Sequence, residues 1–162
     1  MGRPDEWMVK MTAITVSSIG VVRGGRSERV EDHWDEVVST IVFDPGEVGH
    51  DATQGLDDFS HLEVVFFFHL EDRVRRFAEH PRGNRAWPKV GVLAHHGPVR
   101  PNHLGVSRCR LLKTDGLELT VQGLDALDGT PILDIKPYSR HFDPRGEIDE
   151  PAWMDELMSE YY

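Results

Sequence analysis

The side chains best suited to chemistry gather in one Gly- and Pro-rich stretch, HHGPVRPNHLG, at residues 95–105. It holds three imidazoles, at His95, His96 and His103, and the guanidinium of Arg100. An imidazole titrates near neutral pH and can serve as a general acid or base, and a guanidinium binds carboxylates and phosphates. Loops of this composition between rigid strands often carry binding and catalytic residues. The stretch therefore predicts a functional loop.

The spacing of these histidines does not favour a metal site. Adjacent residues of an extended strand point to opposite faces, so His95 and His96 would not converge on one ion. No Asp-x-His or His-x-x-x-His spacing completes a ligand set. Acid/base work or hydrogen bonding near an acceptor atom is the favoured use, and lining of a pocket without a chemical role is the alternative. We expect no bound metal.

The charge of the chain is unevenly distributed. The 162 residues carry a net charge of −10, which disfavours a phosphate backbone as partner because nucleic-acid binding relies on Lys and Arg. Residues 73–113, however, hold ten basic side chains and one acidic side chain, Glu79. Such a basic segment indicates an anionic ligand bound at one place, unless the charges are spread over several faces.

The elements that must position this loop read mostly as short strands rich in β-branched residues. We expect strands at residues 12–22, 37–43, 61–70, 90–95, 106–112, 117–121 and 132–136. The clearest pair is a hairpin around Asp115-Gly116, because apolar and polar residues alternate on both sides of that turn. Short helices are expected at residues 72–80 and within residues 151–162. The pattern predicts a mainly β fold: a single-domain small β-barrel with short helices and a C-terminal helix.

Length and composition bound the organisation of the chain. Its 162 residues suit one domain, divided into an N-terminal tail (1–11), a barrel domain (12–142) and an extension with a short helix (143–162). No apolar run approaches the roughly 20 residues that span a bilayer, and no apolar signal segment opens the chain. We therefore expect no membrane span and a cytoplasmic location. The single cysteine, Cys109, is expected to pack inside the barrel.

Three stretches, read together, resemble the TrmO (YaeB/TsaA) family in that family's order. They are GLDDFSHLEVVFFFH at residues 55–69, VLAHHGPVRPNHLGVS at 92–107 and GLDALDGTPILDIKPY at 123–138. The resemblance implies a β-barrel methyltransferase that acts as a homodimer and uses S-adenosylmethionine as its cofactor. Its implied reaction is methylation of N6 of threonylcarbamoyladenosine at position 37 of certain tRNAs. Methyl transfer from a sulfonium demands mainly alignment and exclusion of water, so few dedicated catalytic groups are needed.

The resemblance also implies which residues form the site. Those expected to bind the cofactor are Phe68, His69, His95, Gly97, Arg100, Asn102, Gly105, Leu124 and Lys136. Those expected to be catalytic are His96, Asp134 and Tyr138. His96 would supply acid/base chemistry, Asp134 would pair with Lys136 at the mouth of the site, and Tyr138 would stack on an adenine or close the pocket. For Asp134 and Lys136 the alternative is a solvated ion pair of little energetic value.

The loop departs from the family pattern in ways that leave the acceptor open. An arginine of the family's lead-in is replaced here by His96, and a proline by His103. The expected partner is therefore tRNA or an anionic small-molecule acceptor, the second alternative being favoured by the overall acidity. A binding module that holds cofactor or tRNA without chemistry is a further alternative, and a metal-dependent hydrolase is a weaker one.

Overall fold

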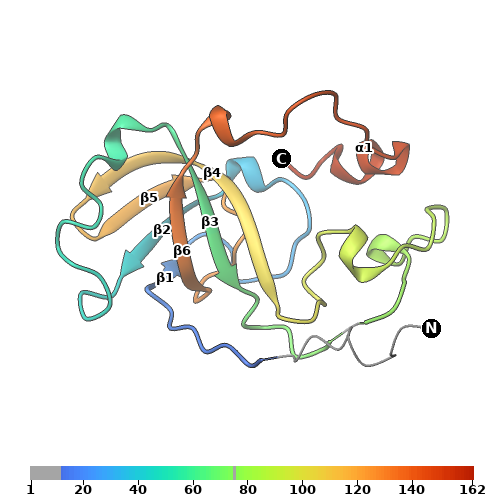
Figure 1. Cartoon of the computed structure of the whole chain (residues 1–162), viewed down its shortest axis with the longest axis horizontal. Helices are drawn as coiled ribbons and strands as arrows, with labels where there is room; N and C mark the ends of the chain where they lie inside the picture. Colours follow the sequence, from blue (N-terminus) through green and yellow to red (C-terminus); the bar gives the residue numbers. More distant parts are fainter. Residues whose placement is uncertain (1–11, 75) are drawn as a thin grey trace, which may run out of the picture.

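The strands form where apolar side chains alternate with polar ones. In the computed structural model, which describes residues 12–74 and 76–162, six strands close into a barrel. They are β1 (Gly20–Arg23), β2 (Val38–Phe43), β3 (His61–Phe67), β4 (Leu104–Asp115), β5 (Glu118–Gln122) and β6 (Pro131–Pro137). All neighbours are antiparallel in the order β1-β2-β5-β4-β3-β6, and β6 pairs with β1 to close the barrel (Figure 1). The predicted mainly β barrel is confirmed. The expected tail at residues 1–11 and the basic residue Arg75 lie outside the described residues.

One face of each strand fills the core. On β3, Leu62, Val64 and Phe66 are buried at every second position. Leu124 is fully buried as well, although it belongs to the connection after β5. Cys109 is buried on β4, as the alternation predicted. Burial of these side chains away from water is the main stabilising contribution to such a fold.

Hydrogen-bonded turns and short helices link the strands. The predicted hairpin is confirmed, because Asp115 pairs with Glu118 and Gly116 adopts a φ of 58° that an L-residue disfavours. The predicted C-terminal helix is α1 (Ala152–Met158). Short 3₁₀ helices occur at η1 (Trp34–Glu36), η2 (Leu56–Asp58), η3 (Pro81–Gly83), η4 (Val92–Ala94) and η5 (Arg140–Phe142). None of the described helices is long and apolar enough to span a membrane.

The long connection from β3 to β4 is less regular than predicted. The helix expected at residues 72–80 and the strand expected at 90–95 are both wrong. Instead, Glu79 and Val90 form an isolated antiparallel bridge with two N–H···O bonds of 2.8 Å. Two prolines lie between them, and proline has no N–H to donate to a helix or a ladder.

Two other strands differ from prediction at their ends. The first was expected at residues 12–22, but β1 begins only at Gly20, because the exposed residues 12–18 have no neighbouring strand with which to pair. The strand expected at residues 61–70 ends at Phe67, where the His69 N–H turns back to the Phe67 carbonyl at 2.8 Å. β-Branched and aromatic composition favours a strand but does not fix where its ladder stops.

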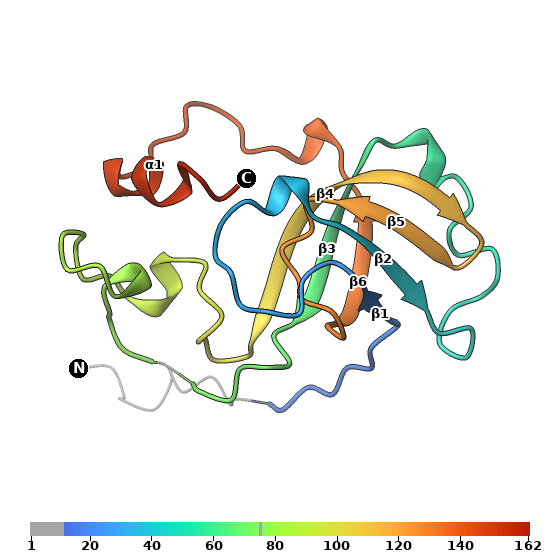
Figure 2. The ribbon, with the colours of Figure 1, turned by 180° about the vertical axis from the view of Figure 1, so that it is seen from behind.

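The barrel has two different ends. At one, the connections 24–37, 68–103 and 123–130 meet, and we call this the loop end (Figure 2). The opposite, hairpin end carries the tight turn after Asp115. Helix α1 lies beside the β3–β4 connection, where the Trp87 ring is 6.3 Å from that of Trp153. The loop end therefore gathers most of the irregular chain, which is where binding residues are usually found.

Candidate functional site

The loop end brings together most of the residues expected to bind a cofactor. Phe68 and His69 follow the last residue of β3, and Gly105 lies opposite Phe66 at the start of β4. Leu124 lies just beyond β5, and the stretch 95–102 leads directly into β4. Segments distant in sequence thus converge because antiparallel pairing places the end of β3 against the start of β4.

The stretch before β4 is held by its own polar groups. Arg100 Nη1 donates to the carbonyl of His95 at 3.1 Å and to that of Gly97 at 3.5 Å. The Gly97 N–H donates to His95 Nδ1 at 3.1 Å, which leaves the ring proton on Nε2, 3.3 Å from a carboxylate oxygen of Glu79. Arg100 therefore stiffens this loop. Asn102 is exposed at its tip.

The predicted histidines do not form a cluster. His96 is exposed, whereas His95 is half-buried against Glu79. His103 adopts a φ of 49°, which the proline of the family pattern could not adopt because its ring fixes φ near −65°. Among the described residues no three His, Cys, Asp or Glu side chains are grouped as a metal ion would require.

Aromatic rings form the apolar part of the loop end. The Phe66 and Phe68 rings meet edge to face with centroids 5.1 Å apart. A Cβ at position 105 would lie 2.4 Å from atoms of the Phe66 ring, so this position accepts only glycine without displacement. The Phe68 N–H donates to the His103 carbonyl at 2.8 Å, which joins the end of β3 to the chain entering β4.

His69 is kept neutral by its surroundings. Burial lowers the pKa of its imidazole, the positive charge of Arg29 lowers it further, and Asp128 opposes both effects. Its Nδ1 lies 3.3 Å from the hydroxyl of the buried Thr130. A neutral imidazole at this position does not repel a cationic ligand.

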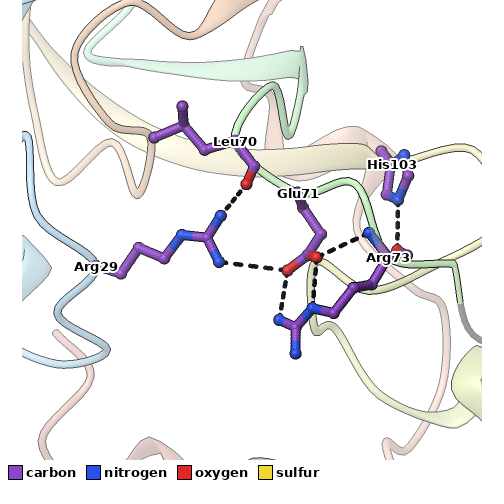
Figure 3. Close-up of polar contacts among 5 residues, drawn as sticks. All are labelled: Arg29, Leu70, Glu71, Arg73 and His103. Carbon is purple, nitrogen blue, oxygen red and sulfur yellow. Dashed lines mark hydrogen bonds and ion pairs between the residues drawn. The ribbon is translucent and has the colours of Figure 1, made fainter.

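A buried carboxylate beside His69 was missed by the sequence reasoning. The Glu71 side chain is only 3% exposed, yet it accepts bonds from two arginines (Figure 3). Arg73 donates through its backbone N–H (3.0 Å), Nε (2.7 Å) and Nη2 (2.7 Å). Arg29 approaches at 3.4 Å and also donates to the Leu70 carbonyl. The hydrogen bond from Arg73 is the main reason that the Glu71 pKa falls to about 2.

The segment after α1 also reaches the loop end. The His33 and Trp34 N–H groups donate to the carbonyls of Glu160 (2.7 Å) and Tyr161 (2.8 Å). The Tyr161 hydroxyl donates to the carboxylate of Asp125, which follows Leu124 in the chain. Burial raises the pKa of this phenol, and the negative charge of Asp125 raises it further. The segment therefore closes one side of the candidate site.

The remaining expected residues lie on the barrel wall. Asp134 contacts Lys136, and these residues pair with Val65 and Glu63 of β3. The Tyr138 N–H donates to the His61 carbonyl at 2.9 Å, at the start of β3. Six residues of strand separate His61 from Phe67, or roughly 20 Å at about 3.4 Å per residue. Within one chain Tyr138 is therefore far from Phe68 and His69, although His61 lies level with Gln122, the residue before the connection 123–130.

Tyr138 has its own partners at that position. Its hydroxyl donates to Asp143 at 2.5 Å, and the Arg108 guanidinium lies 5.1 Å from its ring centre. The hydrogen bond to Asp143 is the first cause of a raised phenol pKa. In this conformation its hydroxyl is a donor and not a base.

Comparison with known proteins identifies relatives over most of the chain. Residues 29–144 match the family described as the tRNA-methyltransferase O N-terminal domain. A protein of Methanothermobacter thermautotrophicus, named a probable S-adenosyl-L-methionine-binding protein, is 46% identical over 82% of this chain and 96% of its own length. A human protein named tRNA (adenine(37)-N6)-methyltransferase is 37% identical over 62% of this chain but only 23% of its own length.

Solved structures show the same fold. The crystal structure of TrmO from Pseudomonas aeruginosa superimposes with a TM-score of 0.72 and 28% identity, over 90% of this chain and 63% of that one. The chain thus spans less than two thirds of this structure and under a quarter of the human relative. The matched residues 29–144 include the expected site residues and all strands but β1. The chain belongs to the TrmO family of tRNA-methyltransferase O N-terminal domains.

Proposed function

We propose that the chain is an S-adenosylmethionine-dependent methyltransferase whose methyl acceptor is N6 of the modified adenosine at position 37 of tRNA. The observation that supports this most is the convergence of Phe68, His69, Arg100, Gly105 and Leu124 at the loop end, since the family resemblance assigns these residues to the donor pocket. Family membership supports the activity, and the name of the human relative supports the acceptor.

The residues of the loop end fit a sulfonium donor. S-adenosylmethionine supplies an electrophilic methyl group, which a nitrogen attacks in line with the leaving sulfur. Phe68 offers an aromatic edge and face, and a cation is attracted to such a face. His69, with its lowered pKa, adds no opposing charge. Arg100 holds the loop before β4 in one shape, which favours alignment over flexibility.

We further propose that the enzyme is a homodimer. Leu104, Val106 and Leu112 are exposed on the outer face of β4, and an apolar row of this kind is often covered by a partner. A second copy is the favoured partner because Asp134 and Lys136 on the same wall carry opposite charges, which suits an isologous contact. Such a dimer would bring Asp134 and Tyr138 of one subunit to the loop end of the other. Replacing Val106 by Glu should then halve the mass measured by light scattering.

An anionic small molecule is the second candidate acceptor. The net charge of −10 favours it over tRNA, because an acidic protein repels a polyanion more strongly than it repels a small anion. If tRNA is the acceptor, we propose that the protein acts in the cytoplasm. In either case the reaction releases S-adenosylhomocysteine, which separates both proposals from a module that binds without chemistry.

Mass spectrometry of the reaction products tests the proposal. The protein would be incubated with S-adenosylmethionine and tRNA that carries threonylcarbamoyladenosine, with the unmodified tRNA as the matched control. We expect methylated nucleoside and S-adenosylhomocysteine in equal amounts with the first tRNA only. Asn102→Ala should weaken the reaction, whereas Gln54→Ala, an exposed carboxamide outside the loop end, should not. S-adenosylhomocysteine formed without tRNA methylation would favour a small-molecule acceptor. Absence of S-adenosylhomocysteine with every acceptor tested would refute the methyltransferase activity.

A further inference from the structure

We propose that Arg29 and Arg73, held side by side by Glu71, form a binding site for a backbone phosphate of the RNA acceptor (Figure 3). The identity of the ligand rests on the proposed function, whereas the arrangement of the three side chains does not. Neither arginine belongs to the residues that the family resemblance assigns to the cofactor. The site would be an addition to the donor pocket on the same end of the barrel.

One buried carboxylate, that of Glu71, holds two guanidiniums. Glu71 follows β3, Arg73 lies two residues later, and Arg29 comes from the connection between β1 and β2. The three side chains leave a net charge of +1. The carboxylate remains ionised through the physiological range, because its pKa is about 2. The positive charge of the group therefore does not depend on pH near neutrality.

The two arginines still have N–H donors available for a ligand. Their side chains are 54% and 60% exposed, whereas that of Glu71 is 3% exposed. A guanidinium has five N–H donors, and Glu71 with the Leu70 carbonyl uses only part of the ten. Exposed arginines whose geometry is fixed in advance lose less entropy when they bind a phosphate.

The position of Arg73 also favours an RNA ligand. His103 Nε2 lies 2.7 Å from the carbonyl oxygen of Arg73. Because a carbonyl oxygen can only accept, Nε2 is the donor. The His103 carbonyl accepts the Phe68 N–H. Arg73 is thus linked through His103 to Phe68, the first residue of the candidate donor pocket in the chain. A phosphate bound by the arginines would place the acceptor strand beside that pocket.

A phosphodiester suits this site better than the carboxylate of the cofactor. A cofactor carboxylate is normally enclosed with the rest of the ligand, whereas an RNA phosphate remains partly in water, as these half-exposed guanidiniums do. Arginine forks bind phosphate oxygens through paired N–H donors. Because both anions have the same chemistry, the test must separate them.

The salt dependence of tRNA binding provides that test. Fluorescence anisotropy would measure the affinity of labelled tRNA for the wild type, Arg29→Gln, Arg73→Gln and the double variant over a range of salt. Each lost phosphate contact should reduce the slope of log K against log salt by about 0.7 to 0.9, the values for single and double strands. Lys113→Gln is the matched control, since Lys113 is 64% exposed and paired with Asp115 but lies at the hairpin end. It should leave the slope unchanged.

Glu71→Gln separates fixed geometry from charge alone. This variant removes one negative charge, so electrostatic attraction alone predicts tighter tRNA binding. If Glu71 acts by positioning the arginines, the variant binds tRNA more weakly by about threefold to tenfold, the equivalent of one hydrogen bond. Should this variant not fold, the arginine variants still test the phosphate contacts. Calorimetry with S-adenosylmethionine should give the same affinity for all variants. An unchanged salt slope in the double variant, or a parallel loss of cofactor affinity, would overturn the proposal. Absence of tRNA binding by the wild type would instead refute tRNA as the acceptor.

Discussion

Replacing Glu71 by Gln should make the protein less stable and remove part of its acid sensitivity. The carboxylate is buried, and in the folded chain its pKa is about 2, compared with an ordinary 4.5. A difference of this size corresponds to about 3 kcal/mol of stability at neutral pH. Since Arg29 and Arg73 are more than half exposed, solvent screening reduces this, and about 2 kcal/mol is expected.

The sign of the pH effect follows from the direction of the pKa change. The folded pKa of Glu71 is lower than the unfolded one, so the stabilisation is complete above pH 4.5 and disappears as pH falls toward 2. The melting temperature of the wild type should therefore fall more steeply than that of Glu71→Gln between about pH 5 and about pH 3. At neutral pH the variant should melt roughly 4–8 °C lower, at about 2–4 °C per kcal/mol for a domain of this size.

Differential scanning calorimetry at a series of pH values would measure both effects. Asp115→Asn is a suitable control, because Asp115 also has a lowered pKa beside Lys113 but is exposed at the hairpin end. It should change the neutral melting temperature little. Parallel pH profiles of the melting temperature for the wild type and Glu71→Gln would refute the reasoning. They would mean that Glu71 has the same pKa in the folded and unfolded states.

Three further predictions concern packing and burial. Gly105→Ala should cost about 1–3 kcal/mol in urea unfolding because its Cβ would lie 2.4 Å from the Phe66 ring, and a second change, Phe66→Leu, should restore part of the loss. Tyr161→Phe should cost about 1–3 kcal/mol because it leaves the Asp125 carboxylate without its donor, and unchanged stability would mean that this segment is not docked in solution. Cys109 should resist iodoacetamide until the protein is unfolded, since burial raises its thiol pKa to about 12, and rapid labelling of the native protein would contradict that burial.

The barrel could be predicted from sequence because its signals are local. The alternation of Leu62, Val64 and Phe66 is visible within a few residues, as is the Asp115-Gly116 turn. In the connection after β3 the loop at residues 95–105 was predicted, but the loss of the helix expected at 72–80 and of the strand expected at 90–95 was not. Local composition favours such elements, while the scarcity of backbone donors near proline opposes them. Composition alone does not weigh these two effects.

The candidate site was predictable in part. The family resemblance indicated Gly105 and Arg100, and antiparallel pairing then accounts for their meeting with His69. The Glu71 group could not be predicted, because Arg29 precedes Glu71 by 42 residues and only the tertiary fold brings them together. A glutamate shortly after a buried strand, followed by an arginine two residues later, was the one local signal. Register along β3 likewise decided that Tyr138 lies away from Phe68 and His69 of its own chain.

The most direct test of the central claim is a thermal-shift titration with S-adenosylmethionine. A ligand that binds only the folded state raises the melting temperature with concentration, by about 2.7 kcal/mol at 100 times its Kd. For a domain of this size that is a rise of roughly 5–10 °C, and S-adenosylhomocysteine should act similarly. Asn102→Ala should need more ligand for the same rise, while Gln54→Ala should behave as the wild type. No rise with either ligand at about 1 mM would contradict a cofactor site at the loop end.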